Sequence, residues 1–437
     1  MDAKRLDAYN EKWKIIEERI GGKTGKETVK ALKELYSIYD DRMVEWMASL
    51  YDPECGAWYH SRSGQAAEGY GPDAESTIEA FQFLEATGMT DGKPYVDVTP
   101  EWLKEKVAKF CYELQDEDGY FYHPQWGKPM YLENGWYSRR SRDGDWCRHL
   151  IRVFSDGKFK YPLPSENLKA GGEKIAEVPE RWRSVENFKN YLYSLDLKNK
   201  SYHTGNTLQS EASERTMYGA VLKEDLHKIT VDWLDENVSP KTGLWQANDA
   251  TDYYAVSGLC KLTWAYNTAH RPLLYPREGI RSAMAAILSE ERAGSATETL
   301  NPWSCIANGI SNVRNFGKGD GFADEILREV WEWAPEGIRK TAEKMEGFKM
   351  PDGGMSYLLR GCCETSQGAP VAISGSREGD INGNCCASSA VINYIFRALA
   401  IDDIMIPLFD GGDLGRFFEI VEAREREWKE QQNVKKG

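Results

Sequence analysis

Hydrophobic and polar positions along this chain predict two kinds of helix that alternate. Helices of the first kind are long and charged and carry one apolar stripe, which is typical of a helix that covers a core from outside. They are expected at 28–50, 100–114, 184–195, 223–238, 276–292 and 323–349. Helices of the second kind are shorter and richer in Ala, Gly, Ser and Cys, as in a helix surrounded by protein. They are expected at 73–86, 145–154, 211–222, 252–269, 302–316 and 384–400.

The two kinds interleave strictly, so each outer helix can form a hairpin with the inner helix that follows it. Six such hairpins predict an all-α fold of the (α/α)6 toroid type. The inner helices of a toroid point the same way, so their first turns and the loops before them would gather at one mouth. Strand-like alternation is almost absent, apart from a short aromatic piece at 120–123.

The chain divides on this pattern into three parts. Residues 1–27 are expected to form a polar helix and a glycine-rich linker, 28–410 the toroid domain with the catalytic site, and 411–437 a charged C-terminal helix and tail. Two connections, 156–183 and 359–383, are too long for simple turns. Long irregular connections in compact domains are usually functional lids or disordered segments. Both lie next to a predicted inner helix, so both could cover the mouth.

A turn motif recurs between the predicted helices, as in repeat architectures. Three copies end in a tyrosine followed by a histidine, which is His60, His123 or His203, while 239–245 and 350–357 repeat the turn without it. Because each histidine occupies the same place in its copy, a hydrogen bond to a neighbouring loop is the first interpretation. Substrate binding or proton transfer at a cavity rim is the alternative.

Net charge, aromatic content and cysteine spacing indicate which partners and which compartment suit this chain. The 69 acidic and 55 basic residues give a net charge of −14, which argues against nucleic acid or an anionic membrane as partner. Aromatic residues make up 12% of the chain, with 15 Trp and 23 Tyr, and rings beyond those that a core needs suggest stacking surfaces for sugars. The charged start, the absence of a long apolar run and nine cysteines without a framework spacing predict a cytoplasmic protein.

Acidic residues cluster at the starts of the predicted inner helices. They are Asp73, Glu75, Asp143, Asp145, Glu211, Glu214, Asp249 and Asp252. Acids in a first turn commonly cap free N–H groups and complement the helix dipole. Glycoside hydrolysis, however, needs two carboxyl groups across the scissile bond, and facing inner helices of a ring can supply them. The candidate catalytic carboxylates are Asp73, Glu75, Asp145, Glu211 and Asp252.

A second candidate constellation lies at 139–149. Asp145 and His149 are four residues apart, which places them on one helical face. The carboxylate could orient the histidine as a general base, or the two could form a simple ion pair at a helix start. The guanidinium of Arg142 is suited to binding a substrate carboxylate, as on a uronic acid; a solvated basic turn is the alternative.

Several of these features resemble the α/α-toroid carbohydrate-active enzymes of the six-hairpin glycosidase-like superfamily. The resemblance covers most of the chain and is carried by the hairpin count, by the Asp-Gly turns at 118–120 and 352–354, and by Asp73-Ala-Glu75-Ser-Thr77 at an inner-helix start. It implies a carbohydrate substrate and admits hydrolases, lyases and epimerases. Terpenoid cyclases have related turns, but the acidic segment 40–45 lacks their Asp-Asp-x-x-Asp order.

Adjacent cysteines could in principle bind a metal. Thiolates can hold zinc, and some toroid arabinofuranosidases use a zinc-bound cysteine cluster. The spacing here lacks Cys-x-x-Cys order, and small packing residues are the other interpretation. We therefore expect no metal and no cofactor, and the weak candidate ligands are Cys362, Cys363, Cys385 and Cys386.

These observations predict a glycoside hydrolase that acts on oligosaccharides, including uronate-containing ones. Asp145 would act with a carboxylate from another inner helix. The side chains expected to contact sugar are Trp58, His60, His123, Arg142, Trp146, His203, Trp245, Tyr253 and Trp303. The alternatives are a toroid lyase that uses Tyr and His, a sugar epimerase, and a glycan-binding toroid without activity.

Overall fold

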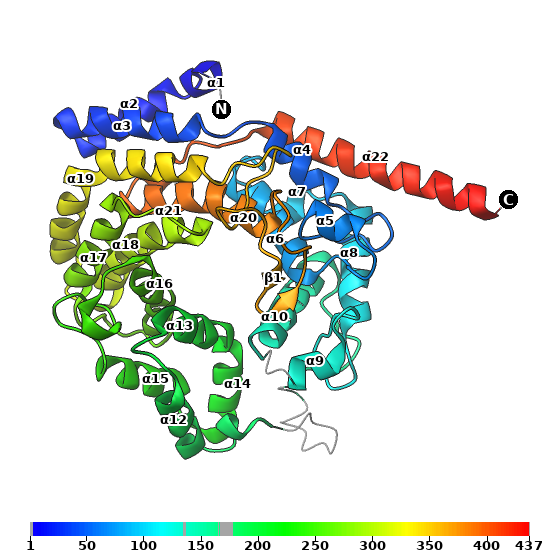
Figure 1. Ribbon diagram of the computed structural model, residues 1–437, viewed down its shortest axis with the longest axis horizontal. Coiled ribbons are helices and arrows are strands. Elements are labelled where there is room, and N and C mark those ends of the chain that lie inside the picture. Colours follow the sequence, from blue (N-terminus) through cyan, green and yellow to red (C-terminus); the bar gives the residue numbers. More distant parts are fainter. Residues whose placement is uncertain (1–2, 134–136, 165, 167–177, 437) are drawn as a thin grey trace.

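The computed structural model describes residues 3–133, 137–164, 166 and 178–436, and this part of the chain is mostly helical (Figure 1). The prediction of an all-α chain is therefore confirmed. The strands β1 (Thr365–Ser366) and β2 (Ala369–Pro370) form one short antiparallel hairpin. None of the helices described combines the length and the apolar character that crossing a bilayer requires.

The helices follow one another along the whole chain. The first are α1 (Ala3–Asp7), α2 (Asn10–Ile20), α3 (Gly22–Tyr36), α4 (Arg42–Ser49), α5 (Arg62–Ala66), α6 (Ala74–Ala86), α7 (Tyr95–Val98), α8 (Glu101–Leu114), α9 (Gly127–Glu133) and α10 (Tyr137–Phe154). Then come η1 (Glu180–Trp182), α12 (Val185–Ser194), α13 (Ser201–Ser210), α14 (Ala212–Leu222), α15 (Leu226–Asp235), η2 (Ala247–Asp249), α16 (Tyr253–Thr268) and α17 (Pro276–Leu288). The last are α18 (Ala296–Phe316), α19 (Asp320–Glu346), α20 (Ile381–Cys385), η3 (Cys386–Ala390), α21 (Val391–Ala398), η4 (Asp402–Ile404) and α22 (Gly411–Lys436).

Contacts between helices close into a cycle. Helix α6 packs on α10, α10 on α13, α13 on α16, α16 on α18 and α18 on α21. The cycle closes because α20 packs back on α6, and η3 connects α20 directly to α21. Helices α3, α8 and α12 lie at the periphery of Figure 1, and α3 runs beside α19 there.

Helix α13 occupies a place in this cycle that the sequence analysis gave to 211–222, so that assignment is wrong. The segment around His203, expected to be a turn, is the helix that packs between α10 and α16. Gly205 permits this close approach, because an added Cβ would lie 2.7 Å from the Cβ of Lys261 on α16. Helix α14, which covers most of 211–222, packs mainly on α15.

Two further helix boundaries differ from the prediction. The outer helix expected at 28–50 is divided into α3 and α4, with a turn over 37–41. The expected glycine linker at 21–25 is wrong as well, because α3 begins at Gly22. Gly25 is buried where α3 crosses α2, and a side chain there would clash with the carbonyl of Glu17. This glycine therefore serves helix packing.

The connection 359–383 carries the β1–β2 hairpin. Its turn residues Gln367 and Gly368 have φ values of 51° and 87°, and two positive φ values are what a type I′ turn requires. The side chains of Gln125 and Trp126 donate hydrogen bonds to the Pro370 carbonyl at 2.9 and 3.1 Å. A small apolar cluster joins the hairpin to the aromatic turn; it comprises Tyr120, Tyr122, Trp126, Tyr131, Ala369 and Val371. The connection expected at 156–183 lies partly outside the described residues.

The C-terminal helix α22 is part of the core. It begins at Gly411, the predicted boundary, and packs on α4. Phe417 is completely buried and stacks on the indole of Trp58, with ring centroids 6.1 Å apart. The first half of α22 therefore seals the core beneath the first turn motif.

We predict that Phe417→Ala lowers the free energy of unfolding by about 3–5 kcal/mol, because it opens a cavity beside Trp58. Urea denaturation followed by tryptophan fluorescence measures the loss. Val434→Ala is the matched control on the same helix, since Val434 is 81% exposed, and it should change stability by less than about 0.5 kcal/mol. Equal effects of the two substitutions would contradict a structural role for the first half of α22.

Candidate active site

A buried guanidinium joins the start of α6 to α10. The side chain of Arg139 has no exposed surface. It donates hydrogen bonds to Asp73 Oδ1 at 3.0 Å and to Glu75 Oε2 at 2.6 Å. Its Nε lies 2.9 Å from Oδ1 of Asp143, four residues later on α10. We call these four side chains, together with Arg142, the arginine–carboxylate cluster.

The local sequence explains why the carboxylates gather here. Asp73 is the N-cap of α6, where it accepts hydrogen bonds from the backbone N–H of Ser76 at 3.1 Å and from the Ser76 hydroxyl at 2.7 Å. Glu75 stands in the first turn of the same helix. The capping interpretation of Asp73 is thus confirmed. The buried guanidinium supplies the counter-charge that these buried carboxylates require.

The pKa values of the two aspartates shift in opposite directions, although burial raises and Arg139 lowers the pKa of each. Burial raises the pKa of a carboxyl group, because it disfavours the charged form. For Asp73 this effect is outweighed by Arg139, His60 and Ser76, so its pKa lies below the usual value. For Asp143 burial outweighs Arg139 and raises the pKa to about 6.

Arg142 extends the cluster from α10 to α13. Its Nη1 lies 3.0 Å from Oε1 of Glu75, and its other nitrogens donate to Asn206 Oδ1 at 3.3 Å and to Ser210 Oγ at 3.1 Å. The hydroxyl of Ser366, on β1, donates to the other oxygen of Glu75. The hairpin is therefore attached directly to the first turn of α6. Unlike Arg139, Arg142 keeps 20% of its side chain exposed.

Glu79 is a functional candidate that the sequence analysis missed. It follows Glu75 by one helical turn, so both side chains lie on the same face of α6. Its Oε2 is buried and has no hydrogen-bond partner among the described residues. Burial, followed by the charges of Glu75 and Asp73, raises the pKa of Glu79 well above its usual value. The detectable signal was a second glutamate in an otherwise apolar inner helix.

Lys261 is the second residue that the sequence analysis missed. It lies in the middle of α16, between the apolar residues Cys260 and Leu262. Burial lowers its pKa; Cys260 raises it in part, and the charge of Arg142 lowers it further. A single lysine within an apolar inner helix was the available signal. Its position beside the arginine–carboxylate cluster could be known only from the fold.

Three more polar side chains lie near one another. Tyr202 on α13 and Tyr357 before β1 are both within electrostatic reach of Cys386, the Tyr357 hydroxyl lies 3.0 Å from that of Thr297, and burial raises the pKa of both tyrosines. Cys386 opens the π-helical turn η3, and its thiol lies within electrostatic reach of Glu79 and Lys261. Single π-helical turns inside helices are frequent at functional sites.

A cavity of about 990 Å³ reaches this group of side chains. Its walls come from α6, from α10 and from the helix formed by η3 and α21. Glu79 and Cys386 line it together with Gln82, Asn393 and Arg397. The cavity is large enough for a small-molecule ligand, and its walls combine apolar surface with a few polar side chains, which is typical of ligand sites.

Asp145 and His149 do not form the predicted pair. Helix α10 begins at Tyr137, so Asp145 lies within the helix and not at its start. Its carboxylate is bound by Arg148 and by the Ser213 hydroxyl, the latter at 3.0 Å. His149 is exposed, and its Nε2 is 2.6 Å from the hydroxyl of Tyr95. Asp145 lines a separate cleft between α10 and α14.

The remaining predicted carboxylates lie apart from Glu79. Glu211 joins α13 to α14, is buried, and lies 3.0 Å from Nη2 of Arg181. Burial raises its pKa, while Arg181 opposes the shift. Asp252 is the exposed N-cap of α16 and accepts a hydrogen bond from the N–H of Ala255 at 2.8 Å. The capping interpretation therefore holds for Asp252.

The three histidines of the turn motif have different environments. His60 is buried, with Nε2 3.8 Å from Oδ1 of Asp380, the N-cap of α20. His123 is also buried and lies 2.8 Å from the Pro72 carbonyl oxygen, which confirms the interpretation as a link to a neighbouring loop. His203 lies exposed on α13, and its Nδ1 is 2.8 Å from the hydroxyl of Tyr254.

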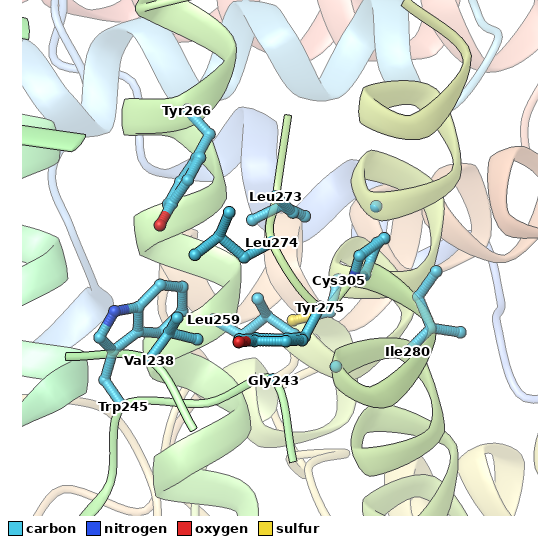
Figure 2. A pocket seen from close by; sticks show the side chains of 13 residues that line it. Val238, Gly243, Trp245, Leu259, Tyr266, Leu273, Leu274, Tyr275, Ile280 and Cys305 are labelled. Carbon is cyan, nitrogen blue, oxygen red and sulfur yellow. The ribbon is translucent and has the colours of Figure 1, made fainter. Parts of the chain in front are cut away.

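Three tryptophans predicted to stack on sugars belong to the core, so that prediction is wrong for them. Trp58, Trp245 and Trp303 are at most 1% exposed, and the indole N–H of each donates a hydrogen bond within the protein. Figure 2 shows Trp245 against Val238 and Leu259 beside an apolar gap of about 10 Å³, too small for a sugar.

Tyr253 and Trp146, which were also predicted to contact sugar, differ in their solvent exposure. Tyr253 is 4% exposed and receives a hydrogen bond from Lys344, so its ring is not available to a sugar either. Trp146 is partly exposed and lies 5.4 Å from the guanidinium of Arg142. Of the predicted stacking residues, Trp146 thus lies nearest the cluster.

The cysteine pairs make separate contacts. The thiols of Cys362 and Cys363 approach Glu378 and the Thr365 carbonyl oxygen, and Cys385 approaches the carbonyl of Glu79. Within the described ranges, no group of three or more His, Cys, Asp or Glu side chains is arranged to hold a metal ion.

Comparison with models of protein families, with curated proteins and with solved structures finds no match for this chain. The function must therefore be inferred from the side chains of the site itself.

We predict that Arg139→Met destabilises the fold by about 3–5 kcal/mol at neutral pH, because it leaves buried carboxylates without a counter-charge. The loss should shrink at acidic pH, where Asp73 and Asp143 take up protons and need no partner. Denaturant unfolding at both pH values tests this. Arg148→Met is the control, because its ion pair with Asp145 is partly exposed, and should cost at most about 1 kcal/mol. A pH-independent loss would contradict the electrostatic explanation.

Proposed function

We propose that this chain is a carbohydrate-active enzyme with an (α/α)6-toroid architecture, and that it hydrolyses glycosidic bonds in oligosaccharides. The closed cycle of contacts through α6, α10, α13, α16, α18 and α20–α21 supports the architecture. The observation that carries the chemistry is Glu79, a carboxyl group with a raised pKa and an unpaired oxygen in the wall of the cavity.

Glu79 is the catalytic acid in this proposal. Glycoside hydrolysis requires a carboxyl group that keeps its proton near neutral pH and gives it to the leaving oxygen. Burial and the nearby charge of Glu75 favour the protonated form of Glu79. After the leaving group departs, the Glu79 carboxylate accepts a proton from the attacking water, which restores the acid.

Glu75 is the neighbouring carboxylate that keeps Glu79 protonated in this proposal. Its ion pairs with Arg139 and Arg142 and its hydrogen bond from Ser366 hold it in one position, one helical turn from Glu79. The fixed negative charge retains the proton on Glu79 before substrate binds. Glu79 thus replaces Asp145 as the proposed acid, because Asp145 is paired with Arg148 and lines a different cleft.

We predict that Glu79→Gln lowers the turnover of a cleaved oligosaccharide by about 10²–10⁴-fold, because the amide cannot donate the acid proton. The assay is the release of reducing ends from a panel of neutral and uronate oligosaccharides. Wild-type activity should fall as the pH rises through the raised pKa of Glu79, since the acid form is then lost.

Glu113→Gln, on the exposed face of α8, is the matched control for this experiment and should keep full activity. Binding of the same oligosaccharides should persist in Glu79→Gln, as measured by calorimetry. An unchanged turnover in Glu79→Gln, or no cleavage of any substrate by the wild type, would contradict the hydrolase.

A lyase is the second candidate, favoured by the neighbouring tyrosines Tyr202 and Tyr357, because Tyr202 is within electrostatic reach of Arg142. A lyase needs a cation near the substrate carboxylate, a base that removes the adjacent proton and an acid for the leaving oxygen. Products with a new double bond, detected by ultraviolet absorbance and lost in Tyr202→Phe, would establish this reaction in place of hydrolysis.

A further inference from the structure

Lys261 carries a charge without a direct partner among the residues that the structure describes, because no hydrogen bond or ion pair joins its ammonium group to any of them. The charges that act on it are those of Cys260, Arg142, Cys386 and Glu75. The stem of the side chain packs closely against Gly205 of α13, and the residue as a whole is partly exposed. A lysine without an ion-pair partner is suited to an anionic ligand.

Arg142 approaches the same place from α10. A guanidinium has five N–H donors, one on Nε and two on each terminal nitrogen. In Arg142, Nη1 binds Glu75, Nη2 binds Asn206 and Nε binds Ser210, so each nitrogen uses one N–H. One N–H on each terminal nitrogen is left for a ligand, which is the pattern that binds both oxygens of a carboxylate. Asn206 is the neighbour of Gly205, so the two cations contact adjacent residues of α13.

The two positive charges destabilise each other. The charge of Arg142 lowers the pKa of Lys261, in addition to the larger effect of burial. Glu75 lies near both, but its oxygens already bind Arg139, Arg142 and Ser366. An added negative charge between Arg142 and Lys261 would relieve this repulsion. A neutral sugar hydroxyl cannot do so.

We propose that Lys261 and Arg142 form a subsite for the carboxylate of a sugar, so that uronate-containing oligosaccharides are preferred over neutral ones. This proposal rests on the hydrolase function proposed above. The subsite adjoins Glu79, because the charges of Glu75 and Arg142 act on both Glu79 and Lys261. Lys261 is therefore a specificity-determining residue, and it places the uronate ring beside the catalytic acid.

Binding of monosaccharides tests the subsite without requiring turnover. D-glucuronate and D-glucose, and likewise D-galacturonate and D-galactose, are titrated into the full-length Glu79→Gln protein in a calorimeter. We expect each uronate to bind at least about tenfold more tightly than its neutral counterpart, since a charged hydrogen bond is lost in the latter. Adding Lys261→Met should abolish the preference, and Lys261→Gln should reproduce this result.

Lys109→Met is the matched charge control, because Lys109 lies exposed on α8, and it should leave the preference unchanged. Equal binding of acid and neutral sugars, or a preference that survives Lys261→Met, would overturn the proposal. Tight binding of glucose 6-sulfate without binding of glucuronate would also overturn it, because the anion would then be a sulfate.

Assays of hydrolysis distinguish a failure of the carboxylate subsite from a failure of the proposed hydrolase function. On matched aryl glucuronide and aryl glucoside substrates, Lys261→Met should lower kcat/KM for the glucuronide by about 10–100-fold more than for the glucoside. Cleavage of both with equal efficiency would refute the carboxylate subsite and keep the hydrolase. Uronate binding that depends on Lys261, without cleavage of either substrate, would refute the hydrolase and keep the subsite.

Discussion

The buried guanidinium of Arg139 is the interaction on which the proposed site depends. A charge without exposed surface requires partners, and three carboxylates from α6 and α10 supply them. The need for these contacts fixes how α6 and α10 are rotated relative to each other. That rotation in turn places Glu79, one turn beyond Glu75, in the cavity wall. Burial in this position raises the pKa of Glu79, and the negative charges of Glu75 and Asp73 in the cluster raise it further.

Close packing of α13 on α16 is the second constraint. Gly205 leaves room for the stem of Lys261, and Arg142 reaches Asn206 beside it. The β1–β2 hairpin is tied to the same group, because Ser366 binds Glu75 and Gln367 accepts a hydrogen bond from Asn206 at 2.8 Å. Segments from five parts of the chain, namely α6, α10, α13, α16 and the β1–β2 hairpin, therefore lie close together. In the proposed function, the catalytic acid Glu79 and the carboxylate subsite therefore depend on the same contacts.

Local patterns predicted the helices well, and the site much less well. The N-caps Asp73 and Asp252 could be inferred because a cap depends on residues a few positions away. The contacts of Asp145 and His149 could not be inferred in this way. Asp145 binds Arg148 and His149 lies against the hydroxyl of Tyr95, so the two do not pair with each other. The large number of tryptophans suggested rings that stack on sugars. Trp58 instead stacks on Phe417, which lies more than 300 positions further along the chain.

The sequence by itself determined the helical class, most helix positions and the capped first turns, because these follow from interactions within a few residues. Only the tertiary structure decided which helices meet and which polar side chains share a cavity. Helix α13 shows this, since its weak pattern gives no sign that it packs against α16, which the close approach at Gly205 permits. Glu79 and Lys261 each interrupt an apolar stretch of sequence, but their surroundings are set by the fold. Burial raises the pKa of Glu79 and lowers that of Lys261, because distant residues remove water and supply charge around them.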